Sequence, residues 1–362
     1  FMLPHVHVPR FNRCRYGVAL VAALAVLGAS PLAAQGQMQP SDHSPTRPQT
    51  PVPPFPYSER EVAFAHPVEG FTLAGTLSIP PASPVAHPEK TADLQTRHPA
   101  VILIPGSGAQ DRDETLFAHK PFAVIKDHLA RRGVAVLRLD DRGVGGSGGD
   151  MAHSTTLDFA TDIYAAVDFL RQQPEIDPAC IGLLGHSEGG VIAPIVAAQR
   201  DDIAFVVLLA GTGVNGAEIL RLQMVDAMKG MIPDASIERL KREGYDLIKR
   251  CGDSALSEAD RLEAVKRLVT IQVGLDPDAT ERPPADQRRI DAGVKQGQSQ
   301  LASPWMRLFL RLEPSESLAK VRCPVLILNG SKDVQVNAAQ NVPVMVKILS
   351  DAGNPDVTAR II

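Results

Sequence analysis

The sequence predicts an α/β protein built on a mostly parallel sheet, and three observations carry this prediction. Continuous apolar runs at 99–104, 133–139 and 203–210 lack the alternation of a strand with one exposed face. Helical patterns separate these runs, as they do in a parallel sheet with right-handed crossovers. A Gly-rich turn at 185–189 joins a further apolar run to a helix. The chain of 362 residues, 44% of them hydrophobic, is long enough for one large domain or two smaller ones.

The amino-terminal residues have the layout of an export signal. Three arginines precede an apolar stretch at 16–27 and a zone of small residues, which predicts a secretory signal peptide over residues 1–34. The apolar stretch is short for a bilayer span, and an uncleaved anchor is the alternative. Residues 35–56 are rich in Pro, Gln and Ser and predict a flexible leader. We therefore expect a periplasmic or secreted protein with no stable membrane insertion after cleavage.

Residues 57–213 are expected to form the first part of the core domain. Alternating apolar residues at 61–65 and 71–79 predict an antiparallel hairpin at a sheet edge. The elements expected next are a buried strand at 99–104, a helix at 117–132, a buried strand at 133–139, and a helix that opens at a Thr155–Asp158 capping box.

The motif Gly185-His186-Ser187-Glu188-Gly189 supplies the candidate nucleophile. A sharp turn between a strand and a helix strains the backbone at the serine and leaves room only for glycines beside it. Such a turn raises the Ser187 hydroxyl above the end of the sheet, and it leaves the Glu188 N–H free to bind a developing oxyanion. The alternative is an ordinary Gly-rich turn, but the buried strand before the motif and the apolar helical face after it favour the nucleophile.

Two further Gly-rich loops follow buried strands. In the loop at 105–108, the Ser107 N–H is the candidate for the second oxyanion donor, and a plain strand–helix turn is the alternative. The loop at 140–149 matches no phosphate-binding pattern. A structural loop with a buried Asp–Arg pair is the favoured interpretation there.

The strand–helix alternation stops after 213. Residues 214–322 show helical spacing only and predict a helical cap inserted over the catalytic end of the sheet, with a separate partner-binding domain as the alternative. Trp305 and its apolar neighbours either line an acyl pocket or pack as ordinary helix residues. The second part of the core, 323–362, begins with a buried strand and carries Asp333 just after it. The order of serine and then aspartate along the chain predicts Asp333 as the acid of a catalytic triad, with a surface turn aspartate as the alternative.

No histidine completes that triad in the expected order. None of the ten histidines follows Ser187, and His186 is expected to point away from the serine hydroxyl. Serine without a base is a poor nucleophile, so residues 1–362 are expected to be catalytically weak. Because the chain stops within an apolar strand, a truncation before the histidine is our interpretation. The histidines are His5, His7, His43, His66, His87, His98, His119, His128, His153 and His186.

Four motifs together resemble those of the α/β-hydrolases, in particular secreted bacterial esterases close to serine aminopeptidases and dienelactone hydrolases. The resemblance runs from about Glu59 onward, and it implies an α/β-hydrolase fold with an inserted helical cap. It implies hydrolysis of carboxylic esters through an acyl-enzyme on Ser187. Asp333 would then be the acid, and the N–H groups of Ser107 and Glu188 the oxyanion donors. The motifs are at 104–113, 140–145, 185–190 and 330–333.

The expected function is therefore that of an exported serine esterase acting on a small-molecule ester. A peptidase or an acyltransferase with the same serine remains open, as does a non-catalytic binding protein. A net charge of −4 without a long basic run gives no support to nucleic-acid binding. No H-x-x-x-H or clustered Cys/His pattern occurs, so neither a metal nor another cofactor is expected.

Overall fold

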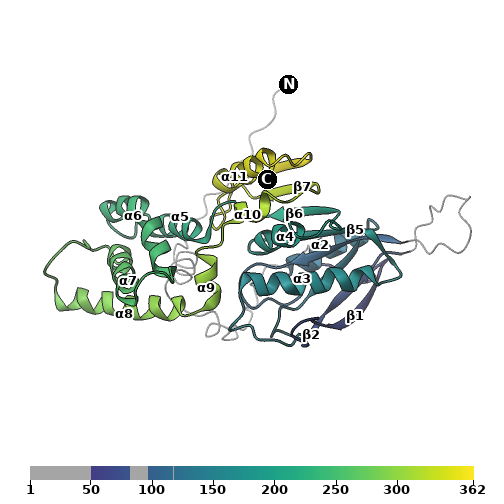
Figure 1. Cartoon of the computed structure of the whole chain (residues 1–362), viewed down its shortest axis with the longest axis horizontal. Helices are drawn as coiled ribbons and strands as arrows, with labels where there is room; N and C mark the ends of the chain where they lie inside the picture. Colours follow the sequence, from purple (N-terminus) through teal and green to yellow (C-terminus); the bar gives the residue numbers. More distant parts are fainter. Residues whose placement is uncertain (1–49, 82–96, 117) are drawn as a thin grey trace, which may run out of the picture.

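The computed structural model describes residues 50–81, 97–116 and 118–362. The predicted signal peptide and most of the predicted leader lie outside the described residues. An eight-stranded sheet has the order β1-β2-β4-β3-β5-β6-β7-β8 (Figure 1). Its strands are β1 (Ser58–Ala65), β2 (Thr72–Ile79), β3 (His98–Ile104), β4 (Ala135–Leu139), β5 (Ile176–His186), β6 (Phe205–Leu209), β7 (Val325–Asn329) and β8 (Val357–Ile361).

The hairpin predicted at a sheet edge is present. β1 and β2 pair antiparallel, β2 continues antiparallel onto β4, and the remaining neighbours pair in parallel. A Cβ atom on Gly75 of β2 would lie 2.2 Å from the carbonyl oxygen of Arg138 on β4. Only glycine permits that close approach of the two strands.

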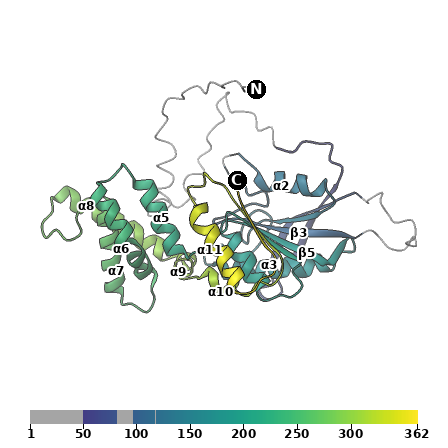
Figure 2. The ribbon, with the colours of Figure 1, turned by 90° about the horizontal axis from the view of Figure 1, so that it is seen from above.

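Helices cover both faces of the sheet (Figure 2). On one face α2 (Pro121–Ala130) buries Phe122 against β3 and β4. On the other face α3 (Thr156–Arg171), α4 (Gly189–Ala197) and α11 (Ala338–Asp351) share a core with the strands. Because both faces are covered, the central strands are apolar without alternation, as the sequence predicts.

The starts of two helices show how local sequence sets their bounds. The Asp158 carboxylate accepts hydrogen bonds from the backbone N–H of Thr155 at 2.8 Å and from its hydroxyl at 2.6 Å, at the predicted start of α3. The prediction for α2 was wrong at its start, because the helix begins at Pro121 and not near residue 117. Proline lacks the N–H that the first turn leaves unpaired, so it favours the first helical position.

The segment between β6 and β7 is helical, and we call residues 214–322 the helical insertion. Its helices α5 to α9 share a hydrophobic core of their own, while Leu318 of α10 joins the core of the sheet. The helices are α5 (Gly216–Met228), α6 (Asp234–Gly252), α7 (Glu258–Gln272), α8 (Pro284–Leu301), α9 (Pro304–Phe309) and α10 (Pro314–Leu318).

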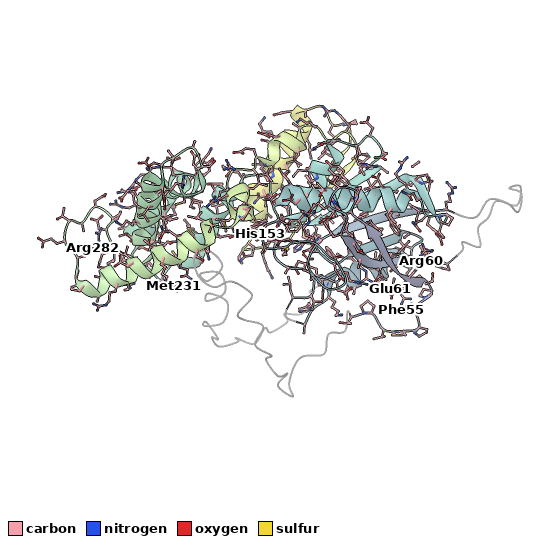
Figure 3. All side chains as sticks on the ribbon, turned by 60° about the horizontal axis from the view of Figure 1, so that its bottom comes forward. Phe55, Arg60, Glu61, His153, Met231 and Arg282 are labelled. Carbon is pink, nitrogen blue, oxygen red and sulfur yellow. The ribbon has the colours of Figure 1, made fainter. Side chains whose placement is uncertain are left out.

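Helices α6 to α8 of the helical insertion stand to one side of the sheet in both views (Figures 1 and 2). Helix α9 contacts α3, and α10 packs against α4 and α11. Met231 and Arg282 lie on the helical insertion, well away from Arg60 and Glu61 on β1 (Figure 3). Within residues 50–81, 97–116 and 118–362, no helix combines the length and the apolar character that a membrane span needs.

Candidate active site

Ser187 occupies the tight turn between β5 and α4. Its φ angle is +52°, in the left-handed region that a residue with a side chain rarely adopts. A Cβ atom on Gly185 would lie 1.9 Å from the carbonyl oxygen of Gly189, and one on Gly189 would lie 2.2 Å from the carbonyl oxygen of Ile104. Both flanking glycines are therefore required by the closeness of backbone to backbone.

The predicted site residues gather at one edge of the sheet. The carboxyl ends of β3, β5, β6 and β7 are in register. Ser107 follows β3, Ser187 follows β5, and Asp333 follows β7. The half-buried Ser187 is also held by its backbone N–H, which donates to the carbonyl oxygen of Leu209 on β6 at 3.0 Å. In open α/β sheets this edge is where ligands bind.

The loop after β3 lies directly against the serine. A Cβ atom on Gly106 would be 3.1 Å from the Cβ atom of Ser187, so the two segments are in contact. Within the described part of the chain, the backbone N–H groups of Ser107 and Glu188 donate no hydrogen bond. Glu188 stands directly before the first helical residue of α4. Two N–H groups without an acceptor beside a serine are available to bind a negatively charged oxygen.

The side chain of Glu188 is buried, with 5% exposed. Its Oε1 accepts hydrogen bonds from the Thr156 hydroxyl and from Nε1 of Trp305, each at 2.7 Å. Burial raises the pKa of this carboxyl, and the hydrogen bonds from Thr156, Trp305 and the Ser107 side chain act against that rise. Trp305 therefore contributes a hydrogen bond at the site in addition to its apolar surface. Leu310, in contrast, is buried in the core of the helical insertion.

His186 and Glu114 form a pair beside the serine. Nδ1 of His186 lies 2.6 Å from Oε1 of Glu114, and the same oxygen accepts the backbone N–H of Gly106 at 2.7 Å. Burial lowers the pKa of His186, but the hydrogen bond to Glu114 and the charges of Glu114 and Asp333 outweigh it. The pKa of His186 consequently lies above its usual value.

Asp333 is half-buried in the loop after β7. Its Oδ1 accepts hydrogen bonds from the backbone N–H groups of Gln335 at 2.8 Å and Val336 at 2.9 Å. These bonds fix the orientation of the carboxylate. The other oxygen, Oδ2, has one contact at the limit of hydrogen-bonding distance, 3.5 Å from Nδ2 of Asn329.

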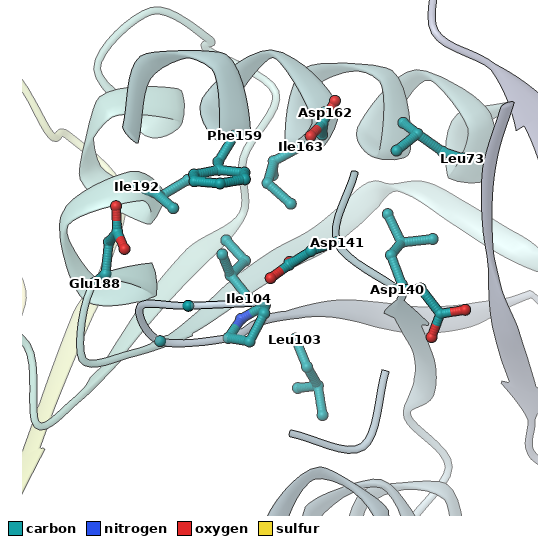
Figure 4. A pocket seen from close by; sticks show the side chains of 14 residues that line it. Leu73, Leu103, Ile104, Asp140, Asp141, Phe159, Asp162, Ile163, Glu188 and Ile192 are labelled. Atoms are coloured by element: carbon teal, nitrogen blue, oxygen red, sulfur yellow. The ribbon is translucent and has the colours of Figure 1, made fainter. Parts of the chain in front are cut away.

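A cavity of about 30 Å³ lies behind the loop after β3 (Figure 4). Asp141, Asp162 and Glu188 line it together with Phe159 and other apolar side chains. Ligand pockets are typically about 300–1,000 Å³, so this cavity has room for water molecules and not for a substrate.

The loop at 140–149 is structural, and its acidic and basic residues pair with partners outside it. Asp140 binds the guanidinium of Arg112 through both carboxylate oxygens. The buried Arg142 binds both carboxylate oxygens of Asp162 on α3, at 2.8 Å each. The buried Asp–Arg pairing that the sequence predicts is therefore present, with partners brought in by the fold.

Three residues of this region were missed as site residues in the sequence. Glu114 and Thr156 carry no motif, because their contacts join segments far apart in the chain. His186 does carry a signal in the sequence, because its place next to Ser187 puts it at the site even though it is not in position to be the base.

A family model described as serine aminopeptidase, S33, matches residues 120–362, which is more than half of the chain. The chain belongs to the serine aminopeptidase S33 family. This family membership and the sheet described above confirm the α/β-hydrolase fold that the sequence predicts.

Individual proteins with a similar sequence or structure share only a limited part of their sequence with this chain. Esterase EstD of Thermotoga maritima is 31% identical over 130 residues, which are 35% of this chain and only 30% of the relative. A solved esterase of Pyrococcus furiosus superposes with a TM-score of 0.50 at 16% identity, over 84% of this chain and 82% of that chain. An α/β hydrolase of Penicillium, GrgF, gives a TM-score of 0.48 at 17% identity, over 84% of this chain and 89% of that one.

Proposed function

We propose that the protein is a serine hydrolase that cleaves carboxylic esters through an acyl-enzyme on Ser187. The observation that carries this proposal is the left-handed turn that holds Ser187 beside the unpaired N–H groups of Ser107 and Glu188. In such a site the serine attacks the ester carbonyl, and the two N–H groups stabilise the charge that develops on the carbonyl oxygen. Asp333 would orient the base and stabilise its charge.

Turnover by residues 1–362 is expected to be weak, because no histidine follows Ser187. Oxyanion stabilisation and substrate binding alone still leave a residual acceleration. A small base added to the solution should then accept the proton of the Ser187 hydroxyl and restore part of the activity.

The test is hydrolysis of p-nitrophenyl acetate with and without added imidazole. Imidazole cleaves this ester by itself, so a Ser187→Ala variant supplies the matched background. The proposal expects the imidazole-dependent rate of the wild-type chain to exceed that of Ser187→Ala, and it expects a fluorophosphonate probe to label Ser187 only in the wild type. Equal rates in the two proteins would refute it.

Peptide hydrolysis is the second candidate, favoured by the description of the matching family as serine aminopeptidases. An acyl-enzyme on the same serine serves both reactions. Aminoacyl p-nitroanilides tested beside p-nitrophenyl esters, each with the Ser187→Ala background, separate the two. A Ser187-dependent rate on the anilides alone would favour the peptidase.

We also propose that the mature enzyme is exported, on the signal-peptide layout of residues 1–34. Expression of the full sequence in a bacterium, followed by cell fractionation and measurement of the amino-terminal mass, tests this. A full-length protein retained in the cytosol would contradict it.

A further inference from the structure

The carboxylate of Glu188 is one point at which the helical insertion meets the candidate active site. It accepts hydrogen bonds from the Trp305 indole N–H of α9 and from the Thr156 hydroxyl in the first turn of α3, each at 2.7 Å. Glu188 itself begins the turn into α4. Three segments that lie far apart in the chain, α3, α4 and α9, thus meet at one side chain.

Glu188 also carries one of the proposed oxyanion donors. Its backbone N–H is one donor, and the loop that carries the other donor, the Ser107 N–H, lies against Ser187, where a Cβ atom on Gly106 would be 3.1 Å from the Ser187 Cβ atom. A buried carboxylate is costly unless several donors satisfy it, so each donor is held firmly in place. The position of the Glu188 N–H relative to the Ser107 N–H therefore depends on how this carboxylate is satisfied.

The hydrogen bond from Trp305 joins Glu188 to the helical insertion, and the Trp305 side chain is held by its neighbours. The Trp305 ring stacks on Phe309 with ring centres 4.9 Å apart and planes 9° apart. The backbone of Phe309 lies against the start of α5, where a Cβ atom on Gly216 would be 2.4 Å from the Phe309 carbonyl oxygen. Movement of the helical insertion would therefore move the indole N–H.

We propose that Trp305 and the Glu188 side chain are positioning residues, through which the seating of the helical insertion sets the geometry of the oxyanion hole. The proposal rests on the proposed function, since it concerns the same serine and the same two N–H groups. It assigns the helical insertion a part in the rate of the chemical step, in addition to any part in substrate selection.

The first measurement is the Ser187-dependent hydrolysis of p-nitrophenyl acetate with imidazole, with kcat and KM determined separately. Trp305→Phe keeps an aromatic ring and removes the N–H, and it should lower kcat at least about tenfold with KM little changed, as expected for a lost hydrogen bond to a charged group. Glu188→Ala should do the same. Glu188→Gln retains an acceptor and should recover kcat to within about threefold of the wild type. Met231→Ala, at an exposed position on the helical insertion, is the control and should leave kcat unchanged.

The second measurement needs no activity. Trp305 is the only tryptophan of the chain, so the fluorescence emission reports on this indole alone. Glu188→Ala should shift the emission to longer wavelength and increase quenching by acrylamide, while Glu188→Gln should resemble the wild type. If Glu188→Ala fails to fold, Trp305→Phe decides the question through kcat.

The outcomes separate this inference from the proposed function. Wild-type kcat in both Trp305→Phe and Glu188→Ala, with Ser187→Ala inactive, would overturn the coupling and leave the serine hydrolase standing. A rise in KM at unchanged kcat would make Trp305 a wall of the substrate pocket and would also overturn it. Full activity in Ser187→Ala would remove the proposed function and this inference together.

Discussion

Oε1 of Glu114 lies 2.6 Å from Nδ1 of His186, although 72 residues separate the two in the chain. Glu114 is 1% exposed and has a φ angle of +52°, a conformation that costs about 1–3 kcal/mol for a residue with a side chain. The same oxygen also accepts the N–H of Gly106. This carboxylate therefore ties the loop after β3 to the end of β5, the two segments that carry the proposed oxyanion donors.

Glu114→Gln is expected to lower the pKa of His186, because it removes the carboxylate charge that holds that pKa up. A histidine whose pKa is raised by folding adds stability below its unfolded pKa of 6.5, and the contribution is lost as pH rises through the folded pKa. The loss of unfolding free energy in Glu114→Gln should therefore be larger at pH 5.5 than at pH 9. Proton NMR of the imidazole and denaturant unfolding at the two pH values measure both effects.

Asp150→Asn provides the control for Glu114→Gln, since it breaks the exposed His153–Asp150 pair, which has the same 2.6 Å separation. Exposed pairs contribute little to stability, and this change should leave the pKa of His186 where it is. An unchanged pKa of His186 in Glu114→Gln would show that the carboxylate does not hold the imidazole.

Gly185→Ala is expected to destabilise the protein by about 3 kcal/mol or more, because its Cβ would lie 1.9 Å from a backbone oxygen that cannot move aside. Gly330→Ala is the matched control, since its Cβ would lie no closer than 3.9 Å to a neighbouring atom. The control should stay within about 0.5 kcal/mol of the wild type. Thermal unfolding of the two variants measures the difference, and equal melting temperatures would contradict the tight turn.

Ser187→Gly is expected to be more stable than Ser187→Ala by about 1 kcal/mol. Glycine adopts a φ angle of +52° without the steric cost that alanine keeps at that position. Both variants lack the hydroxyl, so the comparison isolates the backbone conformation. Urea unfolding decides it, and a more stable alanine variant would mean that the turn is not strained at this residue.

Asp141 and Asp140 are adjacent but should respond to pH in opposite directions. Burial raises the pKa of Asp141 well above 3.8, and the charges of Glu188, Asp162 and Glu114 add to the rise. Burial also acts to raise the pKa of Asp140, but hydrogen bonds from Arg112 and from the Gly146 N–H outweigh it and lower that pKa. Asp141 therefore costs stability at neutral pH, whereas the ionised Asp140 adds to it.

Asp141→Asn should accordingly raise the unfolding free energy at pH 7, with a gain that shrinks as pH falls toward 3.8. Asp140→Asn should lower it at pH 7, with a loss that fades as pH falls from 3.8 through the folded pKa. Melting temperatures of the two variants between pH 3 and pH 8 measure this contrast. If both variants were more stable than the wild type at pH 7, or both less stable, the opposite pKa shifts of Asp141 and Asp140 would be contradicted.

Much of the fold could be predicted from local pattern. The edge hairpin, the buried parallel strands and the turn at Ser187 follow from apolar runs and glycines that act within a few residues. The predicted start of α2 was wrong because Pro121 favours the first helical position, whereas the prediction followed the apolar periodicity. The orientation of the helical insertion relative to the sheet depends on packing between segments that are far apart in the chain. No local sequence pattern specifies that packing.

By itself the sequence determined the class of the sheet, the strained serine turn and the residues that follow each strand end, because these depend on backbone geometry and on burial of neighbouring side chains. Only the tertiary structure decided which polar side chains meet: Glu114 with His186, Arg112 with Asp140, and Trp305 with Glu188. Each of these contacts joins residues at least 28 positions apart. A buried charge must be satisfied by hydrogen-bond donors, and packing of the fold decides which donors lie close to it. The order of residues along the chain does not show which donors these are.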